Sequence, residues 1–261
     1  MDRMTLLDNL PLWAVYLLTL GFGLLAVELG FRLGKYWKKG HPDEQESHIS
    51  PMIAATLGLW AFLLAFLVGI VNNRFDARRE LVVEEANSIG TTYLRAGYLS
   101  EPYASQSREL LREYAGERLK LVELKTYTAA RQRSEEIQPI LWAIAQNLAV
   151  TQPANPVLAL YIDSLNQTID LHTSRVTALN LARIPSTLYI GMYVIATLGL
   201  MMLGFQSGIS GKRNLIVTVI LIFIFSTIML LIVDLDRSWG GLLRVSQQPM
   251  IDLINSFSSY K

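Results

Sequence analysis

Four long apolar runs constrain this chain most strongly, because each is long enough to cross a membrane once as a helix. A helix rises about 1.5 Å per residue, so the hydrocarbon core of a bilayer, about 30 Å thick, needs roughly 20 residues. Three runs carry no charged side chain, and the first is interrupted only by Glu28 near its end. The runs are residues 11–29, 52–71, 188–205 and 215–233. They predict an integral membrane protein with four spanning helices.

The stretch between the second and third runs is rich in charge but balanced. Residues 72–183 contain 13 Lys and Arg against 13 Asp and Glu. Such a segment lacks the positive excess that nucleic acids and anionic lipid surfaces attract, so we expect no nucleic-acid partner. The chain has no cysteine, which excludes disulfides, thiolate catalysis and Cys-based metal sites.

The connector between the two pairs of runs shows helical periodicity, and no part of it alternates as strands do. No helix breaker occurs before Gly97, so we expect the second spanning helix to continue out of the membrane unbroken. Further helices are expected at about 103–127, 134–150 and 157–183. The predicted fold is all-α, with four transmembrane helices and an extramembrane helical bundle inserted between spans two and three. The expected divisions of the chain are residues 1–71, 72–186, 187–233 and a tail, 234–261.

The second run carries two neighbouring stripes of residues spaced three or four apart. One stripe consists of small side chains that let another helix approach closely, which is most often only packing. Its helix-packing candidates are Gly58, Ala61, Ala65 and Gly69. The other stripe consists of Leu59, Phe62, Phe66 and Asn73. In a symmetric oligomer these could form an apolar constriction on the axis, although buried or lipid-facing side chains are an equally common explanation.

Charges near the membrane surface have two interpretations. Glu28 is expected to pair with Arg32 at i, i+4. Arg74 and Arg78 follow the second run directly, and a ring of arginines outside a pore would raise the local anion concentration. Such residues also make salt bridges on solvated helices, each worth at most roughly a few tenths of a kcal/mol. For Arg74 and Arg78 both interpretations stay open.

The segment after the second run resembles a known signature. Residues 74–95 read RFDARRELVVEEANSIGTTYLR and are similar to the signature of the bacterial bestrophin-like domain family of membrane proteins. Two further stretches resemble that family, namely IDLHTSR at 169–175, and DLDR at 234–237 together with RVSQQP at 244–249. The resemblance covers most of the chain from about residue 50. It implies the layout of bestrophins, which are pentameric anion-selective channels with four spans per subunit and a helical domain between spans two and three.

Two functions from different classes fit these features. The first is a bestrophin-like homo-oligomeric ion channel that conducts anions through a hydrophobic neck on the second span. The pore-lining candidates are Leu59, Phe62, Phe66, Asn73, Arg74 and Arg78. Its partners would be the lipid bilayer, further copies of itself and inorganic anions. The resemblance implies a pentamer, and the expected location is the bacterial cytoplasmic (inner) membrane. The alternative is a non-conducting membrane sensor or docking protein that acts through the helical domain.

Enzyme and metal functions find little support in the sequence. His41, His48 and His172 have no partners at the spacing of metal ligands or of a nucleophile and its base. The loop from His41 to His48 could hold a metal loosely, but a solvated loop of this composition is more common. Asp234 and Asp236 supply too few oxygens for calcium, which takes six to eight, so capping or an interhelical salt bridge is expected. We therefore expect no catalysis, no metal and no cofactor.

Two signals for orientation disagree. The loops after spans one and three are rich in Lys and Arg, which by the positive-inside rule places them in the cytoplasm and the helical domain outside. The resemblance to bestrophins places that domain inside. The orientation stays open.

Overall fold

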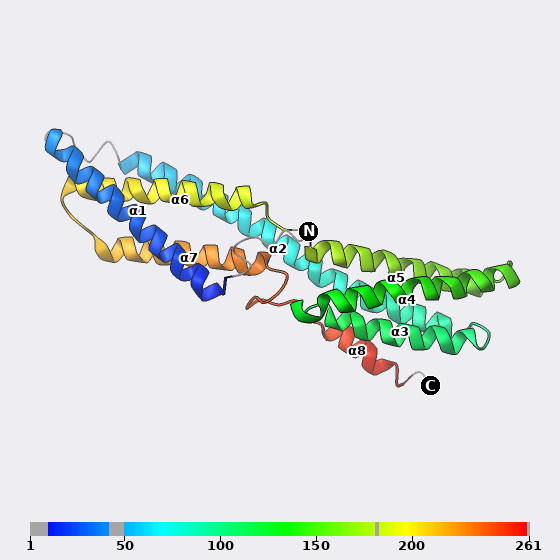
Figure 1. Ribbon diagram of the computed structural model, residues 1–261. Helices are drawn as coiled ribbons and strands as arrows, with labels where there is room; N and C mark the ends of the chain where they lie inside the picture. Colours follow the sequence, from blue (N-terminus) through cyan, green and yellow to red (C-terminus); the bar gives the residue numbers. More distant parts are fainter. Residues whose placement is uncertain (1–9, 42–49, 181–182, 260–261) are drawn as a thin grey trace. The chain divides into compact units, whose positions relative to one another are not determined.

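The computed structural model describes residues 10–41, 50–180 and 183–259, which form α-helices and no strand (Figure 1). The helices are α1 (Leu12–Gly40), α2 (Ser50–Ala96), α3 (Tyr103–Lys120), α4 (Leu124–Thr151), α5 (Pro156–Asn180), α6 (Ser186–Ser210), α7 (Leu215–Asp236) and α8 (Gln248–Ser256). The all-α prediction is confirmed. So is the prediction that one unbroken helix continues from the second apolar run, since α2 runs to Ala96.

The chain divides into two compact units. The membrane unit contains the residues up to Asn73 together with Arg183–Arg237. The helical unit contains Arg74–Ala182 together with Ser238–Lys261. The C-terminal tail therefore belongs to the helical unit.

In the described part of the chain, four helices are long and apolar enough to span a membrane, namely α1, α2, α6 and α7. This agrees with the four predicted spans. Local chemistry explains where two of them begin and end. The Asn214 side chain accepts a hydrogen bond from the backbone N–H of Val217 at the start of α7. Gly211, at the end of α6, has φ +71°, a left-handed conformation that favours glycine.

Helices α1 and α6 approach each other closely at four glycines, two on each helix. A Cβ on Gly30 would collide with the backbone of Met201, and a Cβ on Gly204 would collide with the backbone of Val27. Gly34 and Gly208 lie one turn further along each helix, and a Cβ on either would likewise collide with the backbone of the other helix. Both helices thus carry a G-x-x-x-G pair, the arrangement that lets membrane helices touch through their backbones.

The expected ion pair at the end of the first span is also present. Arg32 donates a 2.9 Å hydrogen bond to Glu28. Arg213, just before α7, lies 3.1 Å from the other oxygen of the same carboxylate. Glu28 therefore links two elements of the membrane unit.

The helical unit consists of the C-terminal half of α2 with α3, α4, α5 and α8. Its core is formed by buried apolar and aromatic side chains from each of these helices, among them Ile89, Leu111, Leu141, Leu165 and Met250. Burial of this kind stabilises a helix bundle in water.

Two expected helix boundaries in this unit were wrong, and one helix was not expected. The helix expected at about 103–127 ends at Lys120. The helix expected at about 134–150 already begins at Leu124. No glycine or proline marks this turn; Leu121 is buried within it, and the Thr126 hydroxyl donates to the carbonyl oxygen of Lys120. Helix α5 is described as far as Asn180, and residues 181–182 lie outside the described part of the chain. Helix α8 was not predicted.

Candidate functional site

The membrane half of α2 has one buried face and one uncovered face. Trp60, Leu64 and Val71 belong to the buried core of the membrane unit, and the Trp60 ring lies 4.4 Å from that of Phe225 on α7. The uncovered side carries Leu59, Phe62 and Phe66, whose exposed fractions are 58%, 68% and 64%. Among the described residues, these three pore-lining candidates belong to none of the buried apolar cores.

The helix-packing candidates lie on the same uncovered side. Gly58, Ala61, Ala65 and Gly69 are all exposed, and a Cβ added to Gly58 or Gly69 would meet nothing. No described helix of this protomer therefore uses these small residues for close approach. A face of this kind is left for lipid or for another protein copy.

The polar and charged candidates do not all share this face. Asn73 is exposed and Arg74 is partly buried. Arg78 is only 5% exposed, and its guanidinium lies 6.0 Å from the centre of the Phe75 ring. Arg78 thus belongs to a buried stripe of α2 and is not brought together with Leu59, Phe62 and Phe66. Whether Arg74 or Arg78 contributes to a pore stays a prediction.

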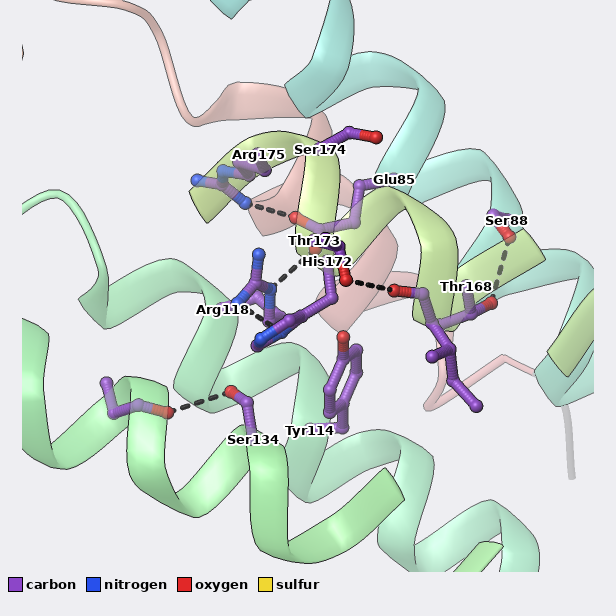
Figure 2. A network of polar contacts seen from close by, with 12 residues as sticks. Glu85, Ser88, Tyr114, Arg118, Ser134, Thr168, His172, Thr173, Ser174 and Arg175 are labelled. Carbon is purple, nitrogen blue, oxygen red and sulfur yellow. Dashed lines mark hydrogen bonds and ion pairs between the residues drawn. The ribbon is translucent and has the colours of Figure 1, made fainter. Parts of the chain in front are cut away.

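A cluster of buried charges lies in the helical unit, centred on Glu85 of α2 (Figure 2). Arg118 of α3 donates from Nε to one Glu85 carboxylate oxygen at 2.6 Å. Arg175 of α5 donates from Nη1 to the other oxygen. All three residues are at most 5% exposed, so a single carboxylate joins three helices away from water. Burying a charge is costly unless it is paired and hydrogen-bonded in this way.

His172 of α5 completes the cluster as a neutral side chain. Its Nδ1 atom lies 2.9 Å from Nη1 of Arg118. Arginine can only donate, so Nδ1 accepts and the ring proton sits on Nε2, 3.7 Å from a Glu135 oxygen. Burial and the nearby Arg118 charge lower the pKa of His172 from 6.5 to about 4. The imidazole therefore carries no charge at neutral pH.

Tyr114 and Gln247 also interact with members of the cluster. Burial raises the pKa of Tyr114 to about 12, so its phenol stays protonated. Arg175 also donates to Gln247 at 2.6 Å, which ties the C-terminal tail to α5. Burial lowers the pKa of Arg175. A carboxylate that accepts from two guanidinium groups is held as a charged anchor and is not available as a base or nucleophile.

Sequence reasoning missed this cluster. It found no partner for His172. The two arginines lie 33 and 90 positions from Glu85, so no local spacing could have revealed them. Residues 169–175 were singled out only by their family resemblance, and they contain both His172 and Arg175.

The acidic residue Asp236 at the end of α7 also has protein partners. The Asp236 carboxylate accepts hydrogen bonds from the backbone N–H of Ile184 at 3.0 Å and from the Tyr189 hydroxyl at 3.3 Å. It therefore holds the beginning of α6, as the capping interpretation expected. Within the residues described, no group of three or more His, Asp or Glu side chains could hold a metal. His41 stacks on Trp37, and the loop to His48 lies outside the described residues.

Comparison with known proteins agrees with this architecture. The family model described as the Bestrophin-like domain matches residues 20–250. No curated protein matches the chain. A structure of a mutated bacterial Bestrophin homologue from Klebsiella pneumoniae has a TM-score of 0.68 at 11% identity, covering 94% of this chain and 97% of that one. A further structure of a Klebsiella pneumoniae Bestrophin homologue has a TM-score of 0.66 at 13% identity, with coverage of 94% and 96%.

At such identities the solved structures show a shared fold alone. The family match is different, because it extends over most of the sequence. The chain belongs to the bestrophin-like family.

Proposed function

We propose that the protein is a homo-oligomeric channel in which the uncovered face of α2 lines a pore for anions. The observation that carries this proposal is that Leu59, Phe62 and Phe66 lie uncovered on one side of α2 while the opposite side is packed. Copies arranged around an axis would bring this face together. The solved structures with the same fold include bacterial Bestrophin homologues, which supports a channel architecture.

The chemistry of this face suits a hydrophobic neck. Phe62 and Phe66 are one helical turn apart, so in a ring of subunits they form two successive apolar constrictions. A narrow apolar passage resists hydrated ions because the ion must shed water without gaining polar contacts. Residues at such a constriction therefore control conduction through their size and polarity.

The positive charge needed for anion preference would come from the residues that follow the neck. Arg74 is partly exposed directly after Asn73, and Arg78 adds its charge from a buried position. A cation near a narrow passage raises the local concentration of anions even when it does not touch them. Glu85 further along α2 is fully paired by Arg118 and Arg175, so it leaves no net negative charge to oppose this.

The proposal places the protein in the bacterial cytoplasmic membrane as a multi-pass protein. Its partners are the bilayer, further copies of the same chain and inorganic anions. It requires no catalytic residue, metal or cofactor. Each subunit would contribute the same α2 face, as closed rotational symmetry demands.

Anion flux into liposomes tests the proposal. Replacing both Phe62 and Phe66 with Ala removes the two apolar rings and is expected to raise flux severalfold above wild type. A matched control replaces two exposed apolar residues of α7, Ile216 and Ile220, with Ala. The control should leave flux unchanged.

Charge variants test selectivity in the same assay. Arg74→Gln is expected to reduce the preference for anions over cations, and Arg78→Gln to do so less if its charge acts from a buried position. The channel proposal fails if folded, oligomeric wild type and the double Ala variant both leave liposomes as tight as empty ones. That result would favour a non-conducting sensor or docking role for the helical unit.

A further inference from the structure

Two arginines of α3 share one aromatic ring in the helical unit. Arg108 and Arg112 are one turn apart, and their guanidinium carbons lie 5.2 Å and 5.4 Å from the centre of the Tyr93 ring. Gly97, in the turn after α2, makes room for this arrangement, because a Cβ there would collide with the Arg108 guanidinium. The local structure thus brings two positive charges onto the same ring.

These two arginines differ from the others on α3, α4 and α5. Each of the other four lies within 4 Å of a carboxylate, namely Arg118, Arg131, Arg133 and Arg175. No carboxylate in the described part of the chain pairs with Arg108 or Arg112. Two acids near them in sequence have other partners, since Glu101 accepts from Ser105 and Glu113 pairs with Arg133.

The hydrogen bonds of the pair are also unequal. Arg112 donates from Nη2 to the Tyr93 hydroxyl at 2.6 Å and to the Phe257 carbonyl oxygen at 3.1 Å, so it also secures the end of α8. The Nε atom of Arg108 is buried and has no hydrogen-bond partner among the described residues. A buried donor without a partner is costly, and a bound acceptor would remove that cost.

We propose that Arg108 and Arg112 form a binding site for a soluble ligand that carries a phosphate group. Two guanidinium forks present several planar donors, which match the oxygens of a phosphate better than a single ammonium would. A dianion also offsets the repulsion between the two positive charges. Attraction to the Tyr93 ring does not neutralise them. This site is independent of the pore face on α2.

Thermal unfolding of the full-length protein in detergent tests the site. Inorganic phosphate is added stepwise, with chloride salt adjusted to keep the ionic strength constant. We expect a saturable rise in Tm for wild type, because a ligand that binds only the folded state stabilises it. Arg108→Gln should fold normally and lose at least about tenfold in phosphate affinity, the effect of losing roughly 1.4 kcal/mol. Arg108→Lys keeps the charge but not the fork and should lose affinity as well.

Arg131→Gln is the matched control, because Arg131 lies on the same unit and already pairs with Glu135. It should keep the wild-type response to phosphate. The proposal is overturned if wild type shows no saturable shift beyond that of chloride, or if Arg108→Gln responds like wild type. A second arm adds phosphatidylglycerol to the micelles. A stabilisation by this lipid that depends on Arg108, without any response to inorganic phosphate, would assign the site to a lipid headgroup and overturn the soluble ligand.

Discussion

The two halves of α2 differ in which side chains they expose and which they bury. The half in the membrane unit leaves Phe62 and Phe66 uncovered, whereas the half in the helical unit buries the Glu85 carboxylate. Uncovered apolar side chains are ordinary in lipid, but a buried charge in a helix bundle is tolerated only when it is completely paired. Whatever covers Phe62 and Phe66 must therefore lie outside the protomer, either lipid or a second copy of the chain. The Glu85 cluster, in contrast, is completed by residues of one chain.

The glycines of the membrane unit show a similar contrast. Gly30, Gly34, Gly204 and Gly208 let α1 and α6 touch through their backbones, whereas Gly58 and Gly69 of α2 face open space. The same residue type thus serves packing inside the protomer in one place and leaves a surface for something outside it in the other. Spacing alone does not separate the two uses.

The largest expected effect comes from removing the buried carboxylate. Glu85→Gln leaves Arg118 and Arg175 buried without their counterion, which is expected to cost about 3–5 kcal/mol. Chemical denaturation of the purified protein, followed by tryptophan fluorescence, measures it. Glu80→Gln on the exposed side of α2 is the control and should change stability by less than about 1 kcal/mol. Equal effects of the two substitutions would contradict the role given to Glu85.

The next effect is a loss of stability in acid caused by His172. Its pKa is lowered to about 4 in the folded protein, against 6.5 ordinarily, so only the unfolded chain takes up this proton between those values. The contribution of His172 to the free energy of unfolding is complete above about pH 6.5. It is lost as pH falls toward 4, by about 3 kcal/mol in total.

His172→Gln tests this contribution, because a glutamine can accept from Arg118 but does not titrate. Unfolding free energies measured from pH 7 to pH 4 should fall less steeply in this variant than in wild type. His41→Gln, in the membrane unit, should keep the wild-type slope. An unchanged slope in His172→Gln would exclude His172 as the source.

The smallest expected effect separates the two sets of glycines. Gly204→Val places a branched side chain against the α1 backbone and should destabilise the membrane unit by about 1–3 kcal/mol. Gly58→Leu meets no neighbour in the protomer, so it should preserve the fold and instead reduce the mass of the oligomer in mild detergent. If Gly58→Leu keeps the wild-type mass, the small residues of α2 are not the subunit contact.

Much of the fold could be predicted because membrane spans are determined by local composition. Runs of apolar residues gave all four spans, and the absence of a breaker before Gly97 predicted the long α2. The turn at Leu121 was missed because it contains neither glycine nor proline and depends on burial of that leucine. Helix α8 was missed because it is short and becomes stable only by packing Met250 into the core.

Part of the candidate site could also be predicted from local sequence. Phe62 and Phe66 follow from helical spacing, and the structure places both on one uncovered face. The same spacing could not separate Arg78, which is buried, from residues that share that face. The Glu85 cluster depends on α2, α3 and α5 coming together, and tertiary contacts of this kind leave no trace in local periodicity.

Electron-microscope images of the purified wild-type protein test the central claim most directly, because that claim is that copies of α2 surround an axis. We predict class averages with rotational symmetry and an axial hole, and loss of these rings in Gly58→Leu. Particles that remain monomeric at every concentration, or symmetric assemblies in which α2 faces the lipid, would contradict the account.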